Sequence, residues 1–160
     1  MWNEINNQNE LNDFMKKIKS FYDSCIKEIK YISGAYVNEN LSMSPINSKN
    51  SLHVVIQCQF TCYPTIELNF DKLHFINLKP VNDMYTCEIF EAHMKYEKGL
   101  FYWYSSYPDK HYKDFDGTII CSEKFKWRTL DNCLGKQELY CLNEIREKDK
   151  TEDGSKPLKK

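Results

Sequence analysis

The stretch LHVVIQCQF, residues 52–60, alternates apolar and polar side chains along most of its length. Successive side chains of a β-strand point to opposite faces, so this alternation predicts a half-buried strand. The stretches IELNF (66–70) and IICSEKFKW (119–127) follow a similar pattern, and Tyr63-Pro64 separates the first strand from the second. These three stretches predict that a β-sheet forms the centre of the fold.

The remaining β-prone segments are short, and turns separate them instead of helices. Lys98-Gly99 and Asp116-Gly117 are predicted tight turns, and the polar segments 38–50 and 105–114 are predicted loops. Strands that follow one another through turns favour an antiparallel meander over parallel crossovers. The further predicted strands are 26–32, 73–78, 85–96 (with a change of parity that indicates a β-bulge near Phe90) and 100–104.

One helix is predicted ahead of the strands. Asn7 followed by Glu10 is typical of a helix start, because the Asn side chain can cap the first amides and the acid can reach back. The chain is therefore expected to be an α+β domain, with an N-terminal amphipathic helix packed on a curled, mostly antiparallel sheet that forms a meander or a partial barrel. The apolar residues at helical spacing are Leu11, Phe14, Met15 and Ile18.

The length of 160 residues fits a single domain. Residues 130–145 have loose helical spacing and predict a terminal helix. From residue 147 onward the chain is charged, and Leu158 is its one apolar side chain. Burial there cannot offset the entropy of ordering the backbone. The domain is therefore expected to span residues 1–146, and residues 147–160 are expected to form a disordered tail.

Composition narrows the functional classes. The formal net charge is −1, and Arg128 and Arg146 are the only arginines, which argues against a nucleic-acid binder. No apolar run approaches the ~20 residues that cross a bilayer, and the N-terminus has no secretory signal. The odd number of cysteines, seven, is not a disulfide framework, so we expect a reducing cytoplasm. Abundant Lys, Asn, Ile and Tyr indicate an AT-rich, bacterial genome.

Acidic residues near the last strand have part of the spacing of a calcium-binding loop. Asp114, Asp116 and Glu123 would stand at loop positions three, five and twelve, with Gly117 at position six. Position one is Tyr112, where such a loop needs a carboxylate, and the flanking residues alternate like strands. We therefore expect a hairpin turn and no metal site.

No local pattern selects a catalytic residue or a cofactor. Cys58 and Cys62 are four residues apart, which is the wrong spacing for a zinc knuckle and places both on one face of a strand. His53, His74 and His93 lie within predicted strands, where histidine is more often a hydrogen-bonded sheet residue than a base. A cysteine and a histidine can meet in space without a local signature. We nevertheless expect no enzyme activity and no cofactor.

The aromatic run FYWY, residues 101–104, is the most informative candidate contact surface. In a strand one alternate set, Phe101 with Trp103 or Tyr102 with Tyr104, fills the core, and the other set is covered or exposed. Exposed Tyr and Trp are favoured at protein interfaces. With the acidic loop that follows the run, the candidate binding residues are Tyr102, Trp103, Tyr104, Tyr107, Asp109, Asp114 and Asp116.

The segment FYDSCI, residues 21–26, resembles the Phe-His-Asp-(Ser/Ala) opening of several small bacterial domains, with Tyr22 in place of the usual histidine. The strands IELNF (66–70) and FKWR (125–128) follow it, as in those domains. Some relatives of that group resemble immunity proteins encoded beside polymorphic toxins. The resemblance implies a cytoplasmic binding protein without catalysis.

The sequence leaves three functional classes open. The first is a non-catalytic cytoplasmic domain that binds another protein, with an immunity-type protein that neutralises a toxin as one form. The alternative is a curled sheet whose interior holds a small apolar ligand, in a pocket lined by residues such as Phe60, Phe70 and Trp103. A filled interior would argue against that alternative. A hydrolase or transferase is the third class, and a buried polar cluster would be its structural cue.

Overall fold

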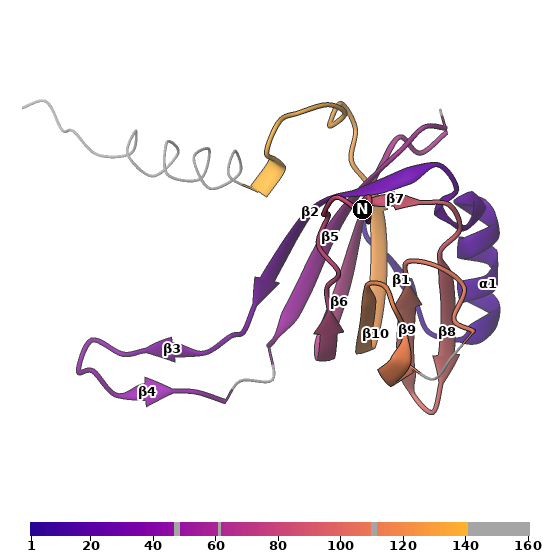
Figure 1. The fold of residues 1–160 in the computed structure, drawn as a ribbon. Helices are drawn as coiled ribbons and strands as arrows, with labels where there is room; N and C mark the ends of the chain where they lie inside the picture. The colour runs from indigo at the N-terminus through magenta and orange to yellow at the C-terminus, as the bar shows by residue number, and fades with distance from the viewer. Residues whose placement is uncertain (47–48, 61, 110–111, 141–160) are drawn as a thin grey trace, which may run out of the picture.

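The computed structural model describes residues 1–46, 49–60, 62–109 and 112–140. These residues form one large β-sheet, a small two-stranded hairpin and one α-helix (Figure 1). The strands of the large sheet are β1 (Asn3–Ile5), β2 (Ser24–Ile32), β5 (Ser51–Cys58), β6 (Thr65–Asn77), β7 (Glu88–Ile89), β8 (His93–Glu97), β9 (Leu100–Tyr104) and β10 (Ile119–Thr129).

The strands of the large sheet pair antiparallel, in the order β7-β2-β5-β6-β10-β9-β8. β10 is long enough to pair with two further strands, with β9 through residues 119–122 and with β1 through residues 125–127. β8 and β9 form a hairpin around Lys98 and Gly99, both at positive φ, as the turn prediction requires. The predicted antiparallel sheet is therefore confirmed.

The sheet curls until its two edges approach each other. β7 and β8 are the edge strands, yet residues 90–92 alone separate them in the sequence. A chain spans at most about 3.6 Å per residue, so the two edges lie within roughly 15 Å of each other at this link. We call this curled sheet and the helix that packs on it the half-barrel. It corresponds to the partial barrel among the predicted architectures.

The prediction of one bulged strand over residues 85–96 is wrong. Phe90 is 64% exposed, and the Ala92 amide donates to the Ser20 carbonyl at 2.8 Å, so the chain leaves the sheet between β7 and β8. β7 pairs with β2, whereas β8 pairs with β9 on the opposite edge. The change of parity marks this break, because an exposed break and a bulge alter the alternation of a sequence in the same way.

The helix α1 (Gln8–Lys17) begins as predicted. The Asn7 side chain accepts a hydrogen bond from the Glu10 amide at 2.9 Å, and the Glu10 carboxylate accepts one from the Asn6 amide at 2.8 Å. The Gln8 side-chain oxygen accepts from the Tyr96 amide of β8 at 2.7 Å and so connects the helix start to the sheet. α1 follows the short strand β1 and lies beside β8 (Figure 1).

The apolar face of α1 packs into the concave side of the sheet. Leu11 and Ile18 are fully buried, and the Phe14 ring centroid lies 4.9 Å from that of Trp127 and 5.4 Å from that of Phe125. The sheet contributes alternate residues of its central strands to the same core, as the period of two predicts. Further members of this core are Phe21, Leu52, Val54, Ile56, Ile66, Leu68, Phe70, Phe101 and Trp103.

Two predicted strands, 66–70 and 73–78, form the single strand β6. Lys72 has a φ of 53°, and close to it the pairing of β6 with β10 shifts by one residue, between Cys121 and Ser122. This bulge bends the strand without ending it. It also interrupts the alternation, which is why the sequence pattern divides the strand in two.

The segment 38–50 is not simply the predicted loop. It contains β4 (Met43–Ser44), which pairs with β3 (Tyr36–Val37) as a separate two-stranded sheet. Figure 1 shows this hairpin projecting away from the half-barrel, beyond the ends of β2 and β5. We call residues 33–46 the arm.

The tight turn predicted at Asp116-Gly117 does not form. Residues 105–118 join β9 to β10, and they include the short 3₁₀ helix η2 (Tyr112–Asp114). The chain folds back because Phe115 is buried, and Gly117 permits this packing: a Cβ atom there would lie 2.6 Å from a ring carbon of Phe115 and 2.8 Å from Ser105 Oγ. The resulting second small core consists of Tyr104, Phe115 and Ile119.

Residues 130–138 make turns and irregular backbone instead of the predicted terminal helix, and helical geometry begins at Leu139. The rest of that predicted helix, the domain boundary at residue 146 and the predicted tail 147–160 lie outside the described residues. Within the described ranges, the helices are too short and too polar to cross a membrane.

Candidate functional site

The arm exposes a dense group of apolar side chains. Glu39 is the one charged residue among residues 33–46. Monomeric proteins rarely leave large contiguous apolar patches in water, so such a projection indicates a contact surface. The exposed apolar residues of the arm are Tyr36 (54%), Val37 (56%), Leu41 (84%), Met43 (69%) and Ile46 (92%).

Hydrogen bonds hold the tip of the arm in one shape. The Asn38 amide donates to the Ser42 carbonyl at 2.9 Å, and Asn38 Nδ2 donates to Ser42 Oγ at 2.9 Å. The Ser42 amide donates to Asn40 Oδ1 at 3.1 Å. Asn favours such turns, because its side chain can accept a hydrogen bond from the backbone amide two residues further on. Leu41 stands in this turn at a φ of 64°. The tip therefore presents the Leu41 side chain to solvent on an ordered loop.

The pairing within the arm contributes little stability. β3 and β4 share two residue pairs, Tyr36 with Ser44 and Val37 with Met43. A two-stranded hairpin without a packed face is marginally stable in water. Contact with another surface would remove these apolar side chains from water and so stabilise the arm.

The structure separates the residues predicted to bind a partner. Trp103 is fully buried in the main core, so its side chain offers no surface to a partner, and Tyr104 is 2% exposed, which leaves it little surface for one. The alternate set that fills the main core is Phe101 with Trp103. Tyr102 is half-buried, and Tyr107 is 72% exposed. A binding role stays a prediction for Tyr102, Tyr104 and Tyr107.

Tyr102 retains surface because it lines a pocket on the outside of β8 and β9. The pocket has a volume of about 380 Å³, and Tyr104 forms part of its wall. Lys95 Nζ lies 5.0 Å from the centre of the Tyr102 ring and 2.9 Å from a carboxylate oxygen of Glu97. The other lining residues are Lys98, Pro108 and Tyr112.

The three aspartates predicted to take part in binding are exposed. Asp116 forms an ion pair with Lys79 at 2.6 Å, and its side chain is 88% exposed. Asp109 and Asp114 lie elsewhere on the connection between β9 and β10. Across the described ranges, the His, Cys, Asp and Glu side chains form no group of three or more that could hold a metal ion.

A buried polar cluster on the outer face of the sheet was not predicted. Glu67 of β6 is 3% exposed, and its Oε2 accepts from Arg128 Nε of β10 at 2.6 Å and from a terminal guanidinium nitrogen at 2.5 Å. His53 Nδ1 of β5 lies 3.0 Å from Glu67 Oε1, and the Tyr140 hydroxyl donates to the same oxygen at 3.3 Å. The Trp2 ring covers the Arg128 guanidinium at 4.5 Å. We call this group the outer cluster.

The Glu67 carboxyl stays ionised in the outer cluster. Burial by itself raises the pKa of the Glu67 carboxyl, but hydrogen bonds from His53 and Arg128 and the charge of Arg128 outweigh it, so the pKa lies below its ordinary value. Both carboxylate oxygens already accept hydrogen bonds. Glu67 is therefore poorly placed to take a proton from a substrate, and the cluster is better suited to structural anchoring.

The outer cluster lies beneath the segment 130–140, which crosses the outer face of the sheet. Gln57 Nε2 donates to the Cys133 carbonyl at 2.9 Å, and a Glu28 carboxylate oxygen accepts from the Leu139 amide at 2.7 Å. A cavity of about 360 Å³ remains between this segment and the sheet, with Glu67 among its lining residues. Side chains of three strands therefore hold a long connection in place.

The buried thiols are weak nucleophiles. Burial raises the pKa of the Cys58 thiol to about 12, and the nearby Cys25 adds to the shift. Burial likewise raises the pKa of the Cys121 thiol. Because the thiolate is the nucleophile, these two cysteines do not have the chemistry of an activated catalytic residue.

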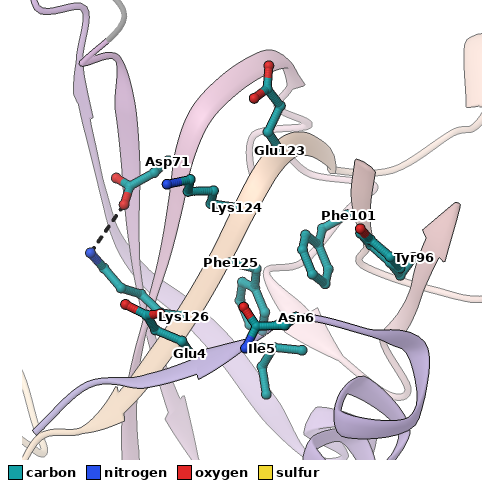
Figure 2. A pocket seen from close by; sticks show the side chains of 10 residues that line it. All are labelled: Glu4, Ile5, Asn6, Asp71, Tyr96, Phe101, Glu123, Lys124, Phe125 and Lys126. Atoms are coloured by element: carbon teal, nitrogen blue, oxygen red, sulfur yellow. Dashed lines mark ion pairs between the residues drawn. The ribbon is translucent and has the colours of Figure 1, made fainter. Parts of the chain in front are cut away.

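A further pocket lies where β10 changes its partner from β9 to β1 (Figure 2). Phe101, Phe125 and Tyr96 line one side of this space, whose volume is about 340 Å³. On the other side Lys126 forms an ion pair with Asp71 at 3.1 Å. The charged lining residues have both signs, so the pocket does not select a ligand of one charge; they are Glu4, Asp71, Glu123, Lys124 and Lys126.

Comparisons with known proteins add no functional assignment. No protein-family model, no curated protein and no solved structure matches this chain. The resemblance of residues 21–26 to immunity-type domains therefore stays a prediction. Among the surfaces described above, the arm has the geometry most typical of a functional contact.

Proposed function

We propose that this chain is a protein-binding domain and that the arm is its main contact element. The supporting observation is the exposure of five large apolar side chains on one projecting hairpin that carries a single charged residue. Burial of aromatic and aliphatic anchors supplies most of the binding free energy at protein interfaces. The arm exposes such anchor side chains to solvent.

The shape of the arm favours a particular kind of partner. Leu41 is 84% exposed at the tip, where hydrogen bonds between Asn38, Asn40 and Ser42 define the turn that presents this side chain. A hairpin that projects from the body enters a concave surface more readily than it covers a flat one. We therefore expect an apolar groove on the partner, with a pocket for Leu41.

The resemblance to immunity-type domains makes a toxin protein the first class of partner to test. Immunity proteins act by occupying the toxin, without catalysis, which agrees with the absence of a catalytic signature in the sequence. The cytoplasm stays the predicted location of the complex.

The alternative function, binding of a small apolar ligand inside the sheet, has less support. Phe70 and Trp103, which were predicted to line such a pocket, are fully buried against neighbouring side chains. The Phe70 ring centroid lies 5.1 Å from that of Phe125, and the Trp103 ring centroid lies 6.2 Å from that of Phe21. Around these two residues, neighbouring side chains occupy the space that a ligand would need.

Co-purification tests the proposal directly. The full chain is co-expressed with the products of neighbouring genes, and a stoichiometric complex is expected. Leu41→Ser combined with Ile46→Ser should then weaken the complex at least about tenfold, because two exposed anchors are lost. Isothermal titration of the purified partners measures the change.

Matched changes off the arm provide the control. Val81 and Met84 are also apolar and exposed, at 61% and 94%, and lie on the connection between β6 and β7. Val81→Ser combined with Met84→Ser should leave the affinity unchanged. Equal affinity of the arm variant and the wild type would show that the arm is not the contact, and recovery of the chain alone in every co-expression would overturn the protein-binding proposal.

A further inference from the structure

Two cysteines meet at one edge of the half-barrel, Cys25 on β2 and Cys87 just before β7. β7 pairs with β2 through two register pairs, and in one of these Cys25 is paired with Glu88. Cys87 is therefore one position away from the residue that faces Cys25. The backbone bends at Cys87, so the strict alternation of a strand does not hold there.

The two thiols are close enough to join. Directly paired Cα atoms of antiparallel strands are about 4.5–5.5 Å apart, and an offset of one residue, about 3.3 Å along the strand, brings the separation to roughly 6 Å, within the range of about 4.4–6.8 Å that disulfides span. Cys25 and Cys87 line the same surface pocket, of about 220 Å³, and the neighbouring Cys87 adds to the effect of burial in raising the pKa of the Cys25 thiol.

The two cysteines differ in their access to solvent. Cys87 is exposed and Cys25 is half-buried beside it. A third thiol, Cys58, is buried in the main core, and its raised pKa keeps it protonated. An oxidant from solution therefore reaches Cys87 first, and Cys25 is the thiol placed to react with the product.

We propose that Cys25 and Cys87 form a reversible disulfide on exposure to a hydroperoxide, and that this disulfide fixes the β7 edge of the half-barrel. The site is a redox modification site, and it does not depend on what the arm binds. β7 is the edge strand with the least pairing, since two register pairs attach it to β2. A covalent bond there should therefore stabilise the attachment of the edge strand more than a bond between two strands that are already fully paired.

The reaction is balanced with hydrogen peroxide as the oxidant. The Cys87 thiolate attacks one peroxide oxygen, the O–O bond breaks, and the departing hydroxide takes the thiol proton and leaves as water. The Cys25 thiol, whose pKa burial and the neighbouring Cys87 raise, then gives up its proton, and the Cys25 thiolate attacks the sulfur of the Cys87 sulfenic acid, so that the S–S bond forms as the S–O bond breaks. The Cys25 proton leaves with that hydroxide as a second water. Two electrons pass from the two thiols to one peroxide, and a dithiol reductant reverses the bond.

The test uses the full chain, hydrogen peroxide and peptide mapping without reductant. We expect a peptide pair joined through Cys25 and Cys87, with Cys58 still a free thiol. The bond closes a long loop, so the oxidised form should melt higher by an amount on the order of 5 °C. Dithiothreitol should restore both the free thiols and the original melting temperature.

Single substitutions distinguish this pairing from general oxidation. In Cys25→Ser the sulfenic acid on Cys87 should persist and react with dimedone, and peroxide should no longer raise the melting temperature. Cys62→Ser, which removes a different exposed cysteine, should behave as the wild type. Oxidation of Cys87 to a sulfinic acid without the bond to Cys25, a bond between any other pair, or an unchanged melting temperature in the bonded form would each overturn the proposal.

Discussion

The interior of the half-barrel and the arm contain the same kinds of apolar side chain, which are buried in the interior and exposed on the arm. In the interior, Phe14 and Trp103 are 2% and 0% exposed and pack against other rings. On the arm, Leu41 and Ile46 are 84% and 92% exposed. Apolar residues in the interior stabilise the fold, whereas those on the arm have no such effect. This difference is the basis of the proposal that the arm contacts another protein.

The largest expected effect is in the interior. Trp103→Ala should lower the free energy of unfolding by about 3–5 kcal/mol, because a fully buried ring leaves a cavity. Trp103→Phe should have a much smaller effect, since it keeps most of the ring and removes a buried indole N–H that has no acceptor among the described residues. Urea unfolding followed by circular dichroism measures both. Equal losses for the two variants would contradict this packing.

The outer cluster should give the next effect. Glu67→Gln removes the charge that pairs with Arg128 and should lower the free energy of unfolding by about 3 kcal/mol, below the upper range for buried pairs because the Arg128 side chain is 37% exposed. Glu123→Gln is the matched control, since Glu123 pairs with Lys72 on the surface and should show no measurable change. If both variants unfold at the same urea concentration, the outer cluster does not anchor the sheet.

Unfolding measured at a series of pH values separates two contributions of Glu67 to stability, that of its charge and that of its packing. The folded-state pKa of Glu67 lies below its ordinary value of 4.5, so its ionised form contributes stability above that pH. The contribution is lost as the pH falls through the folded pKa. The wild type should therefore exceed Glu67→Gln in unfolding free energy at neutral pH, and the gap should narrow in acid. A gap that stays constant down to low pH would assign the loss to packing.

The smallest expected effect on stability is on the arm. Leu41→Ser and Ile46→Ser should each change the free energy of unfolding by less than about 0.5 kcal/mol, since both side chains are already in water. Differential scanning calorimetry of the isolated chain checks this. A loss of several kcal/mol would mean that the arm packs on the half-barrel, and the case for an external partner would weaken.

Local features of the fold could be predicted from the sequence. The helix cap involves residues 7–10 alone, and the alternation of apolar and polar residues over 52–58 predicts the two faces of β5. Both signals are contained within a few neighbouring residues. They identified the helix start, the antiparallel strands and the apolar side of the sheet.

Features that depend on register could not be predicted in this way. His53, Glu67 and Arg128 lie on three strands, and they meet because the pairings of β5 with β6 and of β6 with β10 bring these positions together. The rarity of arginine was interpreted only as an argument against a nucleic-acid binder, and the sequence pattern identified no partner for Arg128. The arm was misread because Asn, Ser and Pro dominate residues 38–50 and conceal the apolar residues between them.

The short link at residues 90–92 makes the half-barrel a ring. Its circumference consists of hydrogen-bonded ladders from β7 round to β8, and a covalent path of three residues completes the circuit. If one pair of neighbouring strands loses its hydrogen bonds, the other strand pairs and the link at residues 90–92 still hold the two sides of the sheet together. Without the link, this second connection between the two edge strands is missing. Cutting the backbone at Phe90 would convert the ring into a ribbon, so a circular permutant opened there should lose cooperativity in unfolding while every strand keeps its sequence.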